Sequence, residues 1–128
     1  MQQPVPQRPG ATEGPGPLSR LERSVLTAML KGAGAGFAAL KAQLTRATVV
    51  SRTHSGVGFV TRIDVPDEVA AVPEAELPRL QPAFAAHPEL TERAEFLLQL
   101  RAGRLAVLEA YCVEGGWPAD ESGFRVVG

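Results

Sequence analysis

The sequence is poor in several features that mark particular classes of protein. It has a single cysteine, Cys112, which excludes an intramolecular disulfide framework. Aromatic residues make up only 5% of the chain, so the core must be built mainly from Leu, Val and Ala. The apolar runs are too short to span a bilayer, and the first residues lack a cationic segment followed by an apolar one. We therefore expect no membrane partner and no secretory signal.

The sequence also lacks a large excess of charge of one sign and a spacing of residues typical of metal sites. The formal net charge is −1, and the eleven Arg and two Lys are scattered rather than gathered into a stripe that tracks a phosphate backbone. The spacing of His54, His87 and Cys112 in the sequence is not that of a zinc site. The sequence thus predicts no nucleic-acid partner, no metal and no cofactor. We expect a cytoplasmic protein of bacterial type.

The rest of the composition is that of one ordinary globular domain. Hydrophobic residues make up 45% of the chain and charged residues 21%. A chain of 128 residues buries about two thirds of its unfolded surface in a single core. Residues 1–17 hold five prolines and three glycines with little to bury, which predicts a disordered tail. We expect a single domain over residues 18–128.

Two helices are expected at the start of this domain. In the stretch "LSRLERSVLTAMLKG", Ser19 and Glu22 have the spacing of a capping box, and Lys31 and Gly32 mark the C-terminal end. Apolar residues recur at helical spacing over residues 36–47. The intervening "GAGAG" lacks the Gly-Lys-Ser/Thr that completes a phosphate-binding loop, so it predicts a plain connection.

From Thr48 onward the hydrophobic period changes to two, which predicts strands. The stretch "TVVSRTHSGVGFVTRIDV" predicts one hairpin, "AEFLLQLRAGRLAVLEAY" a second one and "FRVV" a closing strand. Between the hairpins, residues 66–93 form a proline-rich excursion in which "QPAFA" predicts a short edge strand. This order predicts an α+β domain, with two N-terminal helices packed on one face of a four- to six-stranded antiparallel sheet.

The direction of Glu109 depends on the register of the second hairpin. A two-residue turn at Ala102 and Gly103 points Glu109 toward the core and gathers the apolar residues best. A three-residue turn instead places Glu109 across from Leu97 and Gln99. On the core side the carboxylate must be paired, hydrogen-bonded or protonated. We favour the two-residue turn.

One interpretation of the polar and aromatic residues is a small cleft at the end of the sheet. Glu109 and His54 are then the candidate catalytic groups, with Glu109 as general base or ligand acceptor. The candidate ligand-binding residues are Arg52, Glu109, Tyr111 and Trp117. The other interpretation is structural, with Glu109 anchoring a loop at the rim and Trp117 plugging the sheet edge. A small enzyme or ligand-binding protein is therefore the alternative function.

The second face of the sheet favours a different function. If two helices cover one face, alternation leaves apolar residues on the other face, where they are either covered or used by another chain. The predicted interface residues are Val50, Val60, Leu97 and Leu108. We expect a non-catalytic protein-interaction module, which forms a homodimer or binds a protein partner in the manner of an immunity or accessory protein.

Several stretches, among them "RSVLTAMLKG", "SGVGFVT", "FLLQLRAGRLAVLEAY" and "WP", resemble a group of small uncharacterised bacterial proteins. The likeness covers residues 19–118 apart from the excursion, with a hairpin similar to "SR…TGVGF" and an ending similar to "LEGY…WP". Ala110 stands where that pattern has glycine. The resemblance implies the architecture of two helices and an antiparallel sheet, and no particular activity.

Overall fold

The computed structural model describes residues 10–127 of the chain. Its helices are α1 (Arg20–Met29) and α2 (Ala35–Leu44), and two short 3₁₀ helices, η1 (Glu74–Glu76) and η2 (Glu121–Gly123), lie in loops. The strands are β1 (Thr12–Glu13), β2 (Thr48–His54), β3 (Gly58–Asp64), β4 (Ala83–Ala86), β5 (Ala94–Arg101), β6 (Arg104–Tyr111) and β7 (Arg125–Val127).

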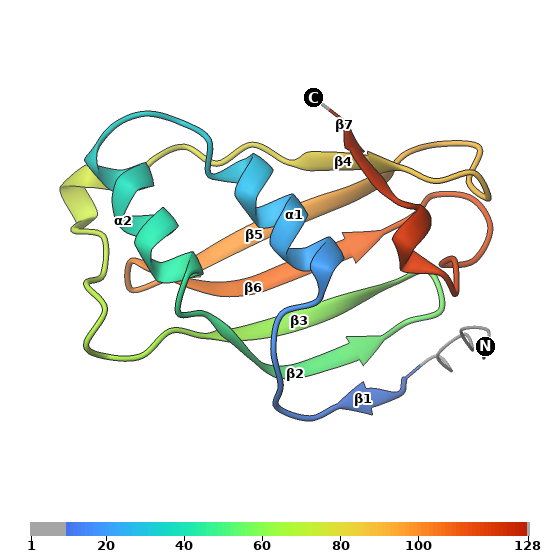
Figure 1. Ribbon diagram of the computed structural model, residues 1–128, viewed down its shortest axis with the longest axis horizontal. Helices are drawn as coiled ribbons and strands as arrows, with labels where there is room; N and C mark the ends of the chain where they lie inside the picture. The colour runs from blue at the N-terminus through green and yellow to red at the C-terminus, as the bar shows by residue number, and fades with distance from the viewer. Residues whose placement is uncertain (1–9, 128) are drawn as a thin grey trace.

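The seven strands form one antiparallel sheet in the order β1-β2-β3-β6-β5-β4-β7, and α1 and α2 lie on the same face of it (Figure 1). This confirms the predicted α+β class with both helices on one side. The sheet has one strand more than the predicted maximum of six, because β1 pairs with β2 at the edge. Within the described residues no helix has the length and apolar character needed to cross a bilayer.

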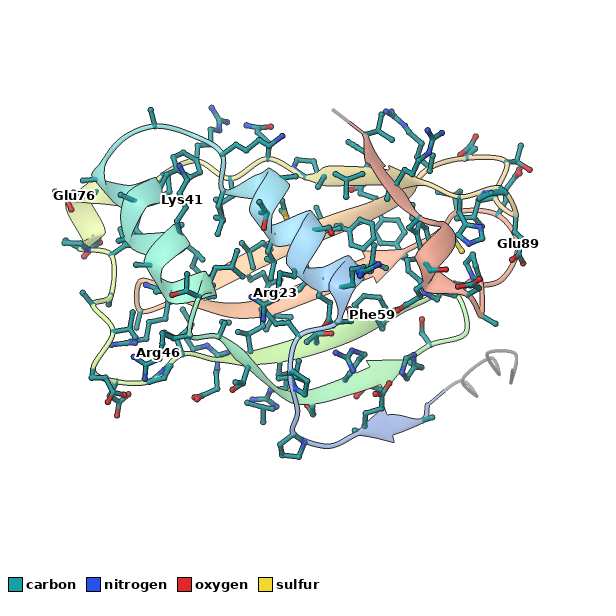
Figure 2. All side chains as sticks on the ribbon, in the orientation of Figure 1. Arg23, Lys41, Arg46, Phe59, Glu76 and Glu89 are labelled. Atoms are coloured by element: carbon teal, nitrogen blue, oxygen red, sulfur yellow. The ribbon has the colours of Figure 1, made fainter. Side chains whose placement is uncertain are left out.

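The core lies between the helices and the sheet, and α1 begins where the capping box predicts. The Ser19 Oγ accepts from the Glu22 N–H at 3.0 Å, and the Glu22 Oε1 accepts from the Ser19 N–H at 2.8 Å. Figure 2 shows the side chains of the described residues, with Phe59 close to the start of α1 and to η2 in this view. The largest fully buried apolar side chains are Phe59, Phe96, Leu26, Leu30, Leu40, Leu105 and Leu108.

Residues 10–17 follow the edge of the sheet. Strand β1 pairs with the C-terminal half of β2, and Gly16 forms an isolated bridge with Val49. The disordered tail predicted for residues 1–17 is therefore wrong for this part of it. Main-chain hydrogen bonds to the edge of β2 order a segment whose composition has little to bury. Residues 1–9 lie outside the described part of the chain.

A β-bulge at Val50 decides which side chains of the first hairpin face the helices. The pairing of β2 with β3 skips one residue there, so the alternation of side chains changes phase. Arg52, opposite the fully buried Thr61, therefore points toward the helices, while Val50 is 46% exposed. Simple alternation in a hairpin without a bulge would instead place Arg52 on the outer face with Val50.

The second hairpin also contains a bulge. Ala102 and Gly103 form the predicted two-residue turn, with the positive φ values (52° and 75°) that a type I′ turn requires. Beyond the turn a register shift places Glu109 opposite Leu97 and buries Leu108 completely. The core-facing direction predicted for Glu109 is therefore wrong. The place of Leu108 on the outer face is wrong for the same reason, since one extra residue inverts every later side chain.

The proline-rich excursion is fastened to α2 and to the turn of the second hairpin. The Gln43 amide group on α2 donates to the carbonyls of Ala70 and Gly103, at 3.1 and 2.9 Å. The Gln43 Oε1 accepts from the N–H of Leu105 at 3.0 Å. Because the excursion packs beside α2, it leaves the central strands of the outer face bare.

The far edge of the sheet is formed by the C-terminal strand. The stretch "QPAFA" provides β4, which pairs with β5 on one side and with β7 on the other. The edge strand predicted there thus lies one position in from the edge. Strand β7, predicted in "FRVV", closes the sheet.

Candidate functional site

The helix-facing side of the sheet holds a fully buried carboxylate, Glu22. Its Oε2 accepts from Arg52 Nε at 2.8 Å and from Thr61 Oγ1 at 2.5 Å. Its Oε1 accepts from Arg52 Nη2 at 2.5 Å and from the Ser19 N–H at 2.8 Å. A carboxylate offers about four lone-pair sites, so Glu22 has no acceptor capacity left for a ligand.

The contacts of Glu22 keep the pair with Arg52 ionised. Burial raises the pKa of Glu22, but the donors from Arg52, Thr61 and Ser19 together outweigh it and hold the pKa below its ordinary value. The hydrogen bonds to Glu22 in turn raise the pKa of Arg52. Removing one partner of such a pair costs about 3–5 kcal/mol, because the other charge stays buried without compensation. We interpret the pair as a structural clamp between α1 and the first hairpin.

Glu13 on β1 extends this network to His54. Arg52 Nη1 donates to Glu13 Oε1 at 2.9 Å, and His54 Nε2 lies 2.5 Å from Glu13 Oε2. His54 is buried at the end of β2, and its Nε2 is occupied by this carboxylate. The geometry therefore gives no support to the predicted catalytic role of His54.

Trp117 closes the core next to this network. Its ring packs edge-on against Phe59, with 5.5 Å between centroids, and lies 4.9 Å from the ring of Phe124. The indole Nε1 donates to Glu121 Oε2 at 2.8 Å. Burial raises the pKa of Glu121 above its ordinary value. These contacts agree with the structural interpretation, in which the indole plugs the end of the sheet.

Glu109 and Tyr111 lie on the opposite, outer face of the sheet. Glu109 is exposed on β6, between Leu97 on β5 and Val60 on β3. Tyr111 lies opposite Glu95 on β5, and interaction with the Glu95 carboxylate raises the pKa of the Tyr111 hydroxyl. Neither side chain reaches the core side, where a carboxylate would need a partner.

The sheet thus separates the four residues of the predicted cleft. Arg52 and Trp117 lie on the helix-facing side, whereas Glu109 and Tyr111 lie on the outer side. The predicted cleft is therefore wrong, and the two catalytic candidates, Glu109 and His54, are also separated. The bulge at Val50 turns Arg52 toward the helices, and the register shift between Gln99 and Leu100 turns Glu109 to the outer face, so the two side chains lie on opposite sides of the sheet.

Three of the four predicted interface residues lie on the outer face. Val50 and Val60 are 46% and 37% exposed, and Leu97 is half-buried beside them. Leu108 belongs to the core, and its neighbour Val107 takes its place on the outer face, half-buried. The outer face therefore keeps an apolar area of slightly different composition from the predicted one.

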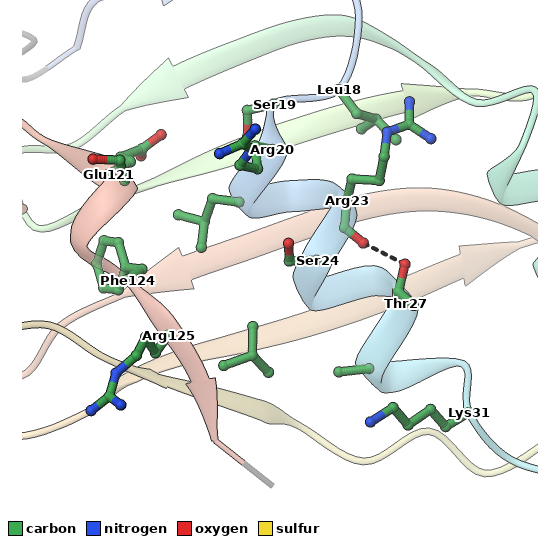
Figure 3. Close-up of a pocket in the computed structure, with 14 residues that line it drawn as sticks. Leu18, Ser19, Arg20, Arg23, Ser24, Thr27, Lys31, Glu121, Phe124 and Arg125 are labelled. Atoms are coloured by element: carbon green, nitrogen blue, oxygen red, sulfur yellow. Dashed lines mark hydrogen bonds between the residues drawn. The ribbon is translucent and has the colours of Figure 1, made fainter.

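A groove of about 1020 Å³ runs between α1 and the C-terminal segment of η2 and β7 (Figure 3). Its apolar lining includes Leu21, Ala28, Phe124 and Val126, and its basic lining includes Arg20, Arg23, Lys31 and Arg125. The sequence holds one signal of this groove, the basic residues on the exposed side of the predicted first helix. The opposite wall comes from the far end of the chain, so no local pattern reveals it.

The remaining candidates for chemistry are metal-ligating groups and the thiol of Cys112. Within residues 10–127 no three His, Cys, Asp or Glu side chains are grouped to hold a metal ion. Cys112 is buried, and this burial raises the pKa of its thiol, which makes it a poor nucleophile.

Comparisons with protein-family models, with curated proteins and with solved structures found no match to this chain. No relative therefore indicates a substrate, a partner or a pathway. The function has to be argued from the surfaces of the molecule.

Proposed function

We propose that this protein is a non-catalytic protein-interaction module that forms a homodimer through the outer face of its sheet. The observation that carries the proposal is the bare face itself, since α1 and α2 both pack on the other side. Val60, Leu97 and Val107 are apolar residues of this face on β3, β5 and β6, and Glu109 lies between Val60 and Leu97. An uncovered sheet face with apolar residues is a typical site of contact with another chain.

The charges on this face are self-complementary. Glu109 lies on β6 between Val60 and Leu97, and Arg62 lies on β3 opposite Val107. Both are exposed, and neither has an ion-pair partner within residues 10–127. In a symmetric dimer the same patch of each copy contacts the other, which allows Glu109 of one copy to pair with Arg62 of the second copy. Dimerisation thereby pairs charges that the single chain leaves to water.

The oligomeric state tests this proposal. Sedimentation equilibrium should show a monomer–dimer equilibrium that depends on protein concentration. Val60→Lys should shift it to monomer without lowering the melting temperature, because the side chain is 37% exposed in one chain. Leu77→Lys is the matched control: Leu77 is 44% exposed next to η1, and its replacement should leave the dimer intact. A chain that stays monomeric at every concentration contradicts the proposal.

A charge exchange tests the pairing of the two copies. Glu109→Arg and Arg62→Glu should each weaken the dimer at least tenfold, because each brings like charges together across the interface. The double variant should recover most of the affinity, since the opposite charges meet again in exchanged positions. If the double variant is as weak as the single ones, Glu109 and Arg62 do not face each other.

A further inference from the structure

We propose that the groove between α1 and β7 is a second binding site, which holds an extended acidic segment of a partner protein. The groove lies on the helix-facing side of the sheet, away from the outer face of the homodimer. The two proposals rest on different residues, so each can fail without the other.

One wall of the groove is an edge strand. Strand β7 is the last strand of the sheet and pairs with β4, and no strand within residues 10–127 pairs with its other edge. Arg125 and Val126 of β7 line the groove. An extended segment can add to such an edge through main-chain hydrogen bonds, with side chains supplying the specificity. The shape of the site therefore favours a strand-like occupant.

The floor of the groove is apolar. Leu21 and Ala28 contribute to it from α1, and Phe124 and Val126 contribute from the C-terminal segment. In an extended segment successive side chains point in opposite directions. Every second side chain of the occupant then reaches the floor, and we expect these to be apolar.

The rim of the groove is basic. Arg20, at the start of α1, and Lys31, two residues after its end, line the groove on one side. Arg125 lines it from β7, where Figure 3 shows its side chain directed away from α1. None of these three has an ion-pair partner within residues 10–127. The one acidic residue of the lining, Glu121, accepts a hydrogen bond from the indole of Trp117. The side chains of the occupant that point away from the floor should therefore be acidic.

The spacing of the basic residues sets the length of the occupant. Arg20 and Lys31 are eleven positions apart in the chain. The helix between them, Arg20–Met29, spans roughly 15 Å along its axis at a rise of about 1.5 Å per residue, and Lys31 follows two residues after its end. An extended segment covers that span in about five residues, at roughly 3.3 Å each. Because its carboxylates must share one face, the spacing is even, and acidic residues four or six positions apart reach both cations.

A synthetic peptide tests the proposal with the full chain. A fluorescein-labelled peptide of about eight residues, with Val and Glu alternating and both ends capped, should bind saturably in a fluorescence anisotropy titration. A peptide of the same composition, with all Val residues preceding all Glu residues, should bind at least tenfold more weakly. Equal binding of the two peptides would mean that charge alone is recognised, and absence of binding would mean that the groove does not take such a segment. Either result overturns the proposal.

Variants of the basic residues beside the groove locate the site. Arg20→Glu and Lys31→Glu should each weaken binding of the alternating peptide at least tenfold, with unchanged melting temperatures. Arg46→Glu is the matched control, because Arg46 is an exposed basic residue just after α2 and does not line the groove. It should change the affinity less than twofold. An equal loss for Arg46→Glu, or tighter binding to an oligonucleotide or to phosphatidylserine vesicles than to the peptide, overturns the proposal.

Methylated peptides test the pairing with β7. A strand offers its amide groups on two edges, and only one edge can pair with β7. N-methylation of the amides along one edge should abolish binding, and N-methylation along the other edge should leave it within about threefold. If both methylated peptides bind as the parent does, the segment is not added as a strand, and the proposal is wrong.

Discussion

The two faces of the sheet treat the same residue types in opposite ways. On the helix-facing side, Glu22 is fully buried and accepts hydrogen bonds from Arg52. On the outer side, Glu109 and Arg62 are exposed, without an ion-pair partner in the described chain. The role of a charged residue in this fold therefore depends on the face of the sheet on which it lies, and a single β-bulge decides which face that is.

The hydrogen bonding of polar side chains also differs between the interior and the surface. Among the described residues no buried side-chain nitrogen or oxygen lacks a hydrogen-bond partner. The described interior therefore has no unsatisfied polar side chain for a ligand to pair with. The two proposed binding sites, the outer face of the sheet and the basic groove beside α1, both lie on the surface.

The largest expected effect compares two apolar residues on opposite faces. Leu108→Lys should lower the free energy of unfolding by more than about 4 kcal/mol, because Leu108 is fully buried and an unpaired charge would replace it. Val60→Lys should change it by about 0.5 kcal/mol or less. Urea denaturation followed by circular dichroism measures both, at a concentration where the chain is monomeric. Similar losses for the two variants would contradict the assignment of faces.

Two arginines of one hairpin give the next comparison. Arg52→Met should cost about 3–5 kcal/mol, because it leaves the Glu22 carboxylate buried and uncompensated. Arg62→Met, on the outer face, should cost about 0.5 kcal/mol or less. Adding Glu22→Leu to Arg52→Met should recover much of the lost free energy of unfolding, because it removes the unpaired Glu22 carboxylate. If this double variant is less stable than Arg52→Met alone, the pair does more than neutralise charge.

The pH dependence of stability tests the burial and pairing of the Glu22 carboxylate. The pKa of Glu22 lies below its ordinary value of 4.5 in the folded chain. Its contribution to stability is therefore complete above pH 4.5 and is lost as the pH falls through the lowered pKa. Between pH 5 and pH 3 the stability of Glu22→Gln should fall less steeply than that of the native sequence. A slope for Glu22→Gln as steep as that of the native sequence would contradict the lowered pKa of Glu22.

The smallest expected effect concerns the edge strand. Glu13 pairs with Arg52 and His54, but its side chain is 42% exposed and solvent screens the interaction. Glu13→Gln should lower the free energy of unfolding by about 1 kcal/mol or less. Glu114→Gln, at an exposed position, is the control and should have no measurable effect. A loss above about 2 kcal/mol would mean that β1 belongs to the cooperative core.

Local patterns predicted much of the fold and little of the site. The capping box of Ser19 and Glu22 placed the start of α1, and Ala102 and Gly103 placed the turn of the second hairpin. The same patterns failed for Arg52, because alternation carries no sign of the bulge at Val50. These patterns also did not reveal the hydrogen bonds of the Gln43 amide group, because its partners Ala70 and Gly103 lie far away in the chain.

By itself, the sequence determined the α+β class, the two helices and the two hairpins. These features depend on hydrogen bonds and hydrophobic periods among residues that are close in the chain. Only the tertiary structure decided the direction of Glu109, the pairing of Glu22 with Arg52 and the existence of the groove. The physical reason is that each of these depends on burial against a distant segment, and one bulge in a strand reverses that burial without changing the local pattern.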